Sequence, residues 1–234
     1  MSNNVNSFQP FPKMARLSRE CVITEKIDGT NAQIFVWDMA QLLEVGGKLV
    51  DPSSIPWLKD QDGFRIAAGS RNKWLTLEKN GDNYGFARWV FDNFEKLKWL
   101  GQGRHFGEWW GAGIQRRYGQ TQKWFSLFNT ARWIQQPVGV GDLSAACLNV
   151  GVPELRVVPT LYRGIFDTGF VEDTLELLRD FGSQAAPGFM DPEGIVIWHE
   201  AARVMFKKTI KDDEQPKSAN ILVDTPPKFG ILSA

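Results

Sequence analysis

The chain has 234 residues, of which 43% are hydrophobic and 23% are charged. This content excludes an intrinsically disordered chain, and the length fits one α/β or α+β domain with a real core. The 27 basic side chains are balanced by 27 acidic ones, so the composition excludes a uniformly basic nucleic-acid-binding protein while leaving room for a local basic groove.

Cysteine content and hydropathy further restrict the class of protein to which this chain can belong. Cys21 and Cys147 are the only cysteines and stand far apart, so neither a disulfide framework nor a zinc site is predicted, and a reducing compartment fits. The start of the chain is mostly polar and uncharged, and no apolar run reaches about 18 residues, so we expect neither a signal peptide nor a membrane span. Ten tryptophans are many for this length, and we interpret them mainly as core residues.

The first predicted strands flank a polar turn. Residues 8–20 are interpreted as an extended lead-in, and residues 20–37 as two strands around Lys26, because β-branched and aromatic residues are frequent in both runs. Residues 38–63 are rich in turn formers, which indicates a hairpin or surface insertion rather than a domain. Residues 64–72 are predicted to form a strand that ends at a polar turn.

The centre of the chain combines a predicted helix with two strands. Residues 83–99 place apolar side chains at positions 86, 90, 94 and 97, which predicts a helix that ends near Gly101. The elements expected after it are a strand over 104–110, a glycine-rich basic loop over 111–119, a strand over 123–129 and a short helix over 142–149.

The last third is predicted to hold a strand over 155–162, an amphipathic helix over 171–181 and strands over 193–198 and 203–210. Acidic Glu172 and Asp173 start the helix, and Gly182 closes it. From Lys211 onward the chain is charged and proline-rich, with one apolar cluster at 221–223. Strands outnumber helices and do not alternate strictly with them, so we expect an antiparallel α+β arrangement.

One polar stretch between two apolar runs, residues 24–31, carries a lysine in a setting suited to chemistry. Lys26 stands between the two predicted strands, and Gly29 follows three residues later. A lysine amine is a nucleophile only when it is neutral, and its reference pKa is about 10.4. Neighbouring cations and burial lower that pKa, whereas carboxylates raise it. Gly29 would let the chain turn tightly or approach a bound phosphate closely.

Six segments in a fixed order give a resemblance to a family. Glu25-Lys26-Ile27-Asp28-Gly29-Thr30-Asn31 resembles motif I of the covalent nucleotidyltransferases, which are ATP-dependent RNA and DNA ligases and mRNA capping enzymes, and with Asn31 it most resembles the phage-type RNA ligases that seal nicks. The further matches are Gly69-Ser70-Arg71, Phe106–Gly111 for motif III, Trp124–Asn129 for motif IIIa, Glu193–Val196 for motif IV and Phe206–Thr209 for motif V. The resemblance implies an α+β, ATP-grasp-like nucleotidyltransferase domain of mainly antiparallel sheets with flanking helices.

The resemblance implies that Lys26 attacks the α-phosphate of ATP, which gives a lysyl–AMP intermediate and releases pyrophosphate. Lys207 and Lys208 would supply positive charge near that phosphate and would lower the pKa of Lys26. The usual motif V lysines are separated by one residue, whereas these two are adjacent. Because only one of two adjacent side chains on a strand points inward, Lys207 is favoured.

The resemblance also implies how the nucleotide is held. Glu108 would bind the ribose hydroxyls, and Phe128 would stack on the adenine, with burial in the core as the alternative for Phe128. Glu25 and the neighbouring backbone would read the amino edge of adenine. Asn31 would position the phosphate, and Arg71 would contact both the nucleotide and the terminal nucleotide at a nick.

A divalent metal is implied as the second cofactor beside ATP. Glu193 resembles the motif IV carboxylate that binds Mg²⁺ or Mn²⁺ directly or through water, and a site with one or two protein carboxylates suits Mg²⁺. Asp28 would serve either the turn or the metal shell. Relatives often have an acid after the stacking aromatic, whereas this chain has Asn129.

The later steps require nucleic acid with a 5′-phosphate end, which receives AMP, and a 3′-hydroxyl, which displaces it. Arg71, Arg116 and Arg117 are the first candidates for contacts to this substrate. Further candidates for phosphate contacts are Lys13, Arg16, Arg19 and Lys123. The segment after motif V is too short for the C-terminal OB or helical domain of the larger relatives, so residues 1–234 are expected to form a single domain.

The leading hypothesis is therefore an ATP-dependent RNA ligase that acts on nicked duplexes containing RNA, as a monomer without membrane association. By the same resemblance, a phage origin and action in the bacterial cytoplasm are expected. A minimal DNA ligase and a GTP-dependent capping enzyme are the alternatives among enzymes. A non-catalytic protein that binds nucleic-acid ends is the alternative from another class, because Asn129 and the adjacent lysines depart from the family pattern.

Overall fold

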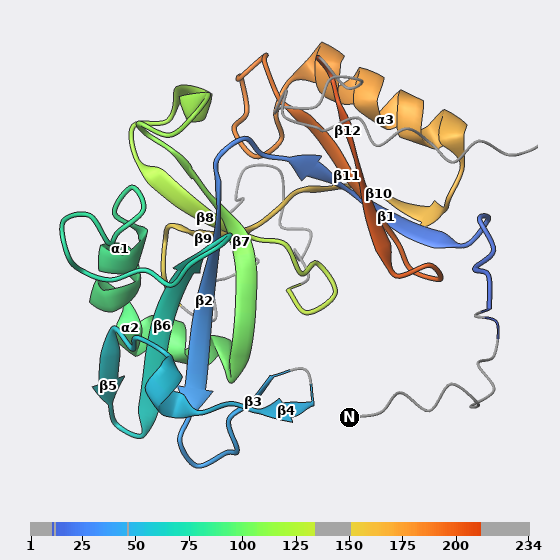
Figure 1. Cartoon of the computed structure of the whole chain (residues 1–234). Coiled ribbons are helices and arrows are strands. Elements are labelled where there is room, and N and C mark those ends of the chain that lie inside the picture. Colours follow the sequence, from blue (N-terminus) through green and yellow to red (C-terminus); the bar gives the residue numbers. More distant parts are fainter. Residues whose placement is uncertain (1–10, 12, 46, 134–150, 212–234) are drawn as a thin grey trace, which may run out of the picture.

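Two β-sheets meet near the middle of the molecule in the computed structural model, and helices cover their outer faces (Figure 1). The structure describes residues 11, 13–45, 47–133 and 151–211. Every strand pair in the two sheets is antiparallel except β8 with β9. This arrangement confirms the α+β expectation with mainly antiparallel sheets.

The smaller sheet, called sheet A here, has the strand order β10-β1-β11-β12. Its strands are β1 (Glu20–Lys26), β10 (Thr160–Ile165), β11 (Gly194–His199) and β12 (Val204–Thr209). One face packs against α3 (Thr168–Phe181), where Ile23 and Ile195 join Leu175 in a buried cluster. The helix starts three residues earlier than predicted, because the side chain of Asp167 caps it by accepting from the Gly169 amide.

The larger sheet, sheet B, has the order β5-β6-β2-β7-β8-β9. Its strands are β2 (Thr30–Asp38), β5 (Lys59–Gln61), β6 (Phe64–Ser70), β7 (Gly103–Gly111), β8 (Lys123–Leu127) and β9 (Leu155–Val157). The predicted strand over 155–162 is in fact two strands, one in each sheet. The chain changes sheets at Val158 and Pro159: the Val158 amide donates to Leu127, and the Pro159 carbonyl accepts from Glu25. Proline cannot donate to a ladder, so the break falls there.

The helix predicted over 83–99 is divided. It forms α1 (Phe86–Asp92), α2 (Phe94–Leu97) and a 3₁₀ turn, η2 (Lys98–Leu100), because Asn93 leaves helical geometry with φ −98° and ψ 14°. The predicted apolar positions are nevertheless correct: Phe86, Val90, Phe94 and Leu97 are all fully buried against sheet B. Burial rather than helix length therefore decides which side chains face the core.

The segment 38–63 packs on the opposite face of sheet B. It contains β3 (Glu44–Val45), β4 (Lys48–Leu49), η1 (Pro52–Ser54) and the edge strand β5, as expected for an insertion with a hairpin. Its Leu43 and Ile55 pack on Phe35 and Ala67. The predicted helix over 142–149 and the cluster at 221–223 lie outside the described residues. No helix in the described ranges is both long and apolar enough to span a membrane.

Candidate active site

Lys26 and Glu193 meet at the centre of the molecule. Lys26 is the last residue of β1 and lies opposite Gly194, the first residue of β11. This register brings the Lys26 amine to 2.5 Å from Oε2 of Glu193, whose side chain is only 2% exposed. Two residues predicted to act together from separate motifs are thus joined by strand pairing.

Glu108 extends this polar centre from sheet B. Asn31 on β2 lies directly opposite Glu108 on β7, and its side-chain amide donates to Oε2 of Glu108 at 2.7 Å. The Gly29 amide donates to Oε1 at 3.2 Å. Burial raises the pKa of Glu108 to about 7, although the bond from Asn31 and the charge of Lys26 oppose the shift. Glu108 therefore senses Lys26 electrostatically and changes charge near neutral pH.

Arg71 and Asn31 continue the chain of contacts outward. Arg71 is exposed after the end of β6, and its Nε donates to Oδ1 of Asn31 at 2.9 Å. The result is a continuous line from the surface through Arg71 and Asn31 to the carboxylate of Glu108. The structure thus brings together three residues that the sequence assigned to nucleotide contacts.

Gly29 permits the close contact between the Lys26 turn and β7. A Cβ atom at position 29 would lie 2.5 Å from the Trp109 carbonyl oxygen and 2.8 Å from the Cβ of Trp110. These distances are too short for any side chain, so only glycine fits here. Gly29 therefore allows the Lys26 turn to approach the backbone of sheet B closely.

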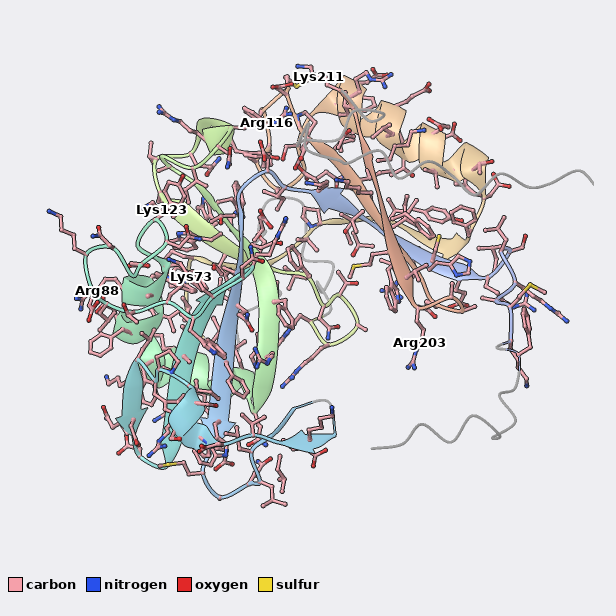
Figure 2. All side chains as sticks on the ribbon, in the orientation of Figure 1. Lys73, Arg88, Arg116, Lys123, Arg203 and Lys211 are labelled. Carbon is pink, nitrogen blue, oxygen red and sulfur yellow. The ribbon has the colours of Figure 1, made fainter. Side chains whose placement is uncertain are left out.

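Arg116 joins the segments that carry Lys26 and Glu193. Its Nε lies 3.1 Å from Oδ2 of Asp28, and its Nη1 lies 3.0 Å from Oδ2 of Asp191 and 2.9 Å from the Asp191 carbonyl oxygen. Figure 2 shows Arg116 on the loop after β7, beside the loop that leads into β11. Arg116 thus pairs with two carboxylates, and its contact with nucleic acid stays a prediction.

The same contact bears on the two roles expected for Asp28. Its carboxylate pairs with Arg116, which supports the role in the turn, and the role in the metal shell stays a prediction. The described part of the chain contains no cluster of three or more His, Cys, Asp or Glu side chains suited to a metal. Glu193 is the remaining carboxylate of the predicted metal pair, and Mg²⁺ bound mainly through phosphates and water needs no more than one or two.

Tyr118 supports the turn and was missed by the sequence reasoning. Its hydroxyl accepts from the Asp28 amide at 2.8 Å, and its ring, 1% exposed, packs edge-on against Trp110 and lies 4.6 Å from the Phe189 ring. The loop around it is strained, with φ values of 43°, 58° and 49° at Gln115, Arg117 and Tyr118. An aromatic residue inside the glycine-rich basic loop was the available signal.

Glu25 faces away from Lys26, toward the α3 side of sheet A. Its carboxylate is 1% exposed and accepts from the Ser183 hydroxyl at 2.5 Å and from the amides of Gln184 and Ala185 at 2.8 Å. Burial raises the pKa of Glu25 above its ordinary value, and these three hydrogen bonds offset only part of that rise. The expectation that the Glu25 side chain reads adenine is therefore wrong, because this carboxylate anchors the loop after α3. Ser183 is a second residue that the sequence reasoning missed.

The register of β12 separates the two motif V lysines. Lys207 pairs with Val196, which pairs with Thr24, so Lys207 shares the face of Lys26. Lys208 pairs with Ile195 on the other face, and its amine forms an ion pair with Glu172 of α3. The assignment of Lys208 as a catalytic residue is therefore corrected, and the preference for Lys207 agrees with the register.

The remaining candidates lie at the surface. Phe128 follows β8, is 41% exposed and donates its amide to the Phe106 carbonyl, so it is not the core residue that was its alternative reading. Oδ1 of Asn129 accepts from the amides of Ala131 and Arg132, which gives this departure from the family pattern a role in the turn. Arg117 is exposed, as are Lys13, Arg16 and Arg19 of the lead-in, whereas Lys123 donates to the Tyr84 carbonyl.

Comparison with known proteins adds to this geometry. Residues 19–211, most of the chain, match the family model described as RNA ligase. Among solved structures, the chain is similar to three mutants of Naegleria gruberi RNA ligase: one with ATP and Mn at a TM-score of 0.50 and 16% identity, a second with ATP and Mn at 0.48 and 18%, and one with AMP and Mn at 0.48 and 18%. Each alignment covers 82% of this chain and 50% of the other. A search of curated proteins gave no match.

The chain thus spans about half the length of these solved relatives. The likeness at a TM-score of 0.50 supports the fold, namely the nucleotidyltransferase domain expected from the sequence.

Proposed function

The chain belongs to the RNA ligase family, and we propose that it is an ATP-dependent RNA ligase that works through a lysyl–AMP intermediate. The observation that carries this proposal is the partly buried contact between the Lys26 amine and Glu193, with Glu108 electrostatically coupled to both. A motif I lysine beside carboxylates from motifs III and IV is an arrangement suited to adenylyl transfer.

In the first step, the Lys26 amine attacks the α-phosphorus of ATP. A nitrogen–phosphorus bond forms, the bond to the bridging oxygen breaks, and pyrophosphate leaves with the electron pair. Glu193 is 2.5 Å from the amine and is the nearest acceptor for the proton that Lys26 must lose. Lys207, on the same sheet face, offsets the negative charge of the phosphate oxygens.

Binding of the nucleotide depends on the residues beside this centre. Glu108 accepts hydrogen bonds from the ribose hydroxyls, and the exposed ring of Phe128 stacks on adenine, a contact worth about 1–3 kcal/mol. Mg²⁺ or Mn²⁺ entering with the triphosphate would be held by Glu193 and would neutralise charge on the phosphate oxygens. Asp28 pairs with Arg116, so we assign it to the turn in this proposal.

In the second and third steps, AMP passes to a 5′-phosphate end and is displaced by a 3′-hydroxyl. Arg71, exposed beside Asn31, is placed to contact the terminal nucleotide. Asn31 in the motif favours the nick-sealing, phage-type branch and therefore a duplex substrate that contains RNA. The chain spans about half the length of its solved relatives. That this chain alone joins the two RNA ends is therefore part of the proposal.

Incubation with labelled ATP or GTP and Mg²⁺ tests the first step. Wild type should form a covalent adduct with ATP, Lys26→Ala should form none, and the control Lys96→Ala, at an exposed lysine on α2, should match wild type. An adduct with GTP alone would contradict the ligase assignment. A panel of nicked duplexes with RNA or DNA on each side then tests the substrate: sealing only of all-DNA nicks would favour a minimal DNA ligase.

A further inference from the structure

One face of sheet A is left open by the helices. Residues Cys21, Ile23, Ile195 and Ile197 point toward α3 and are buried. The alternate residues lie on the opposite face, which α3 does not cover (Figure 1). By strand register this open face carries Thr24 and Lys26 of β1, Val196 and Trp198 of β11, and Met205 and Lys207 of β12. The nucleophile thus lies at one end of the face that α3 leaves open.

The edge strand β12 gives this surface its chemistry. Lys207 is exposed, Met205 is 69% exposed, and Trp198 opposite it is half-buried. Arg203 precedes β12 with φ 55° and donates its amide to the His199 carbonyl, which fixes the turn between β11 and β12. Within the described ranges, neither Lys207 nor Arg203 forms a side-chain ion pair. Two exposed cations therefore flank an apolar side chain along one strand.

The acidic side chain nearest to Arg203 in the described sequence contacts a different cation. Glu200 is the carboxylate nearest in sequence to Arg203, and it lies 3.9 Å from the guanidinium of Arg163 on β10. Figure 2 shows Arg203 at the tip of the β11–β12 hairpin, directed away from α3. Within the described residues, two cations without ion pairs and an exposed apolar side chain continue from Lys26 along this face, which suits the backbone of a nucleic acid.

We propose that the open face of sheet A, along β12 from Lys207 to Arg203, binds the phosphate backbone of the RNA duplex beside the joint. The inference rests on the proposed function, because it takes the joint to be at Lys26. Four residues of a strand separate the two cations, about 13 Å at 3.3 Å per residue. At the spacing of about 3.4 Å per phosphate in a DNA duplex the two cations span about four phosphates, and slightly more on the shorter rise of an A-form RNA duplex.

The geometry also gives the length of duplex that Arg203 needs. Thr209 is in register with Gly194 and hence with Lys26, and Arg203 lies six residues before Thr209. That separation is about 20 Å along the strand, or about six nucleotides from the joint. Arg203 should therefore contribute to binding only when the duplex arm on its side is longer than about six base pairs.

The test measures binding of nicked RNA duplexes to the full chain over a range of salt concentrations. Arg203→Ala should weaken binding roughly three- to tenfold and lower the salt slope by about 1. Arg88→Ala is the matched control, because Arg88 is also exposed but lies on α1, at the far side of sheet B (Figure 2). It should change neither quantity, and Arg203→Ala should leave adduct formation with ATP alone unchanged.

Duplexes with one arm shortened to four base pairs provide the second measurement. The effect of Arg203→Ala should disappear when one particular arm is short and persist when the other is short. Met205→Glu, which puts an acid between the two cations, should weaken binding more than Leu177→Glu, at a similarly exposed position on α3. Neither substitution disturbs the buried core.

The proposal for this surface would be overturned by no binding of the duplex by wild type, by equal losses for Arg203→Ala and Arg88→Ala, or by a loss that persists when both arms are short. A loss confined to single-stranded RNA would assign the face to a different substrate and would also overturn it. Failure of the proposed function is a separate outcome, since a chain that forms no lysyl–AMP can still show the arm-dependent loss of binding.

Discussion

Lys26 and Glu193 form an ion pair at 2.5 Å although 167 positions separate them in the chain. The pair exists because β1 ends where the neighbouring strand β11 begins. Glu193 is 2% exposed and Lys26 is 23% exposed, so the carboxylate is the more deeply buried partner. The arrangement holds the amine in place before any substrate binds.

Removing the Lys26 ammonium should destabilise the fold. We expect Lys26→Met to lower the free energy of unfolding by about 2–3 kcal/mol, because a buried carboxylate loses its cation. The double variant Lys26→Met/Glu193→Gln should recover most of that loss, because the buried charge is gone. Urea titrations of all four members of the cycle measure the coupling, and additive effects would show that the pair is not formed in solution.

Arg116 should act as a positioning residue. It touches Asp28, two residues after Lys26, and Asp191, two residues before Glu193. Arg116→Ala should slow adenylylation at saturating ATP about ten- to a hundredfold, since a shift of about 1 Å in a reacting group has this effect. Arg117→Ala, at the exposed neighbour, is the control and should leave the rate unchanged. Equal adenylylation rates for the two variants would show that Arg116 does not position the reacting groups.

The two motif V lysines should behave differently. Lys207 lies on the face of Lys26, so Lys207→Ala should reduce the rate of adduct formation. Lys208 faces α3, where it pairs with Glu172, so Lys208→Ala should leave the rate near that of wild type. Its effect on stability should be at most about 1 kcal/mol, because both partners are partly exposed. Single-turnover adenylylation of the two variants decides the matter, and the opposite ranking would show that the β12 register is wrong.

Glu108 should make ATP affinity depend on pH near neutrality. Its pKa is raised to about 7 by burial, and only the ionised carboxylate accepts from both ribose hydroxyls. We therefore expect the dissociation constant for ATP to fall as the pH rises from 6 to 8, which is the range about one unit either side of that pKa. Glu108→Gln should lack this part of the dependence, measured by calorimetry at each pH.

The contribution of Glu108 to the free energy of unfolding should fall as the pH rises, whereas ATP affinity should rise. The folded pKa of about 7 exceeds the ordinary value of 4.5, so the folded chain holds more protons than the unfolded chain between these values. The contribution of Glu108 is therefore fully present below pH 4.5 and is lost as the pH rises through 7, by about 3 kcal/mol. The free energy of unfolding of Glu108→Gln minus that of wild type should therefore be larger at pH 8 than at pH 5. An unchanged difference between the two proteins would contradict the raised pKa.

The strands that carry the site could be predicted because their signals are local. Alternating β-branched and aromatic residues mark β1 and β2 on either side of Lys26, and β11 begins one residue after Glu193. Motif order then paired Lys26 with Glu193 correctly. Asn93, which breaks the central helix, carries no comparable signal, because the apolar spacing continues across it.

The errors concern contacts between distant segments. Glu25 is adjacent to Lys26, and only the pairing with Ile195 shows that its carboxylate points to the buried face. Arg116 was a candidate for phosphate contacts because it lies in a basic loop, and its pairs with Asp28 and Asp191 form only in the folded chain. Charge and composition indicate which residues could contact a phosphate, whereas register and packing decide which of them are available.

Intact-mass spectrometry after incubation with ATP and magnesium tests the central claim most directly. We predict that wild type gains one adenylyl group and that peptide mapping places it on Lys26. Lys26→Ala should gain none, while circular dichroism confirms that it is folded. An unmodified wild-type mass, or a folded Lys26→Ala variant that still carries the adduct, would contradict the account.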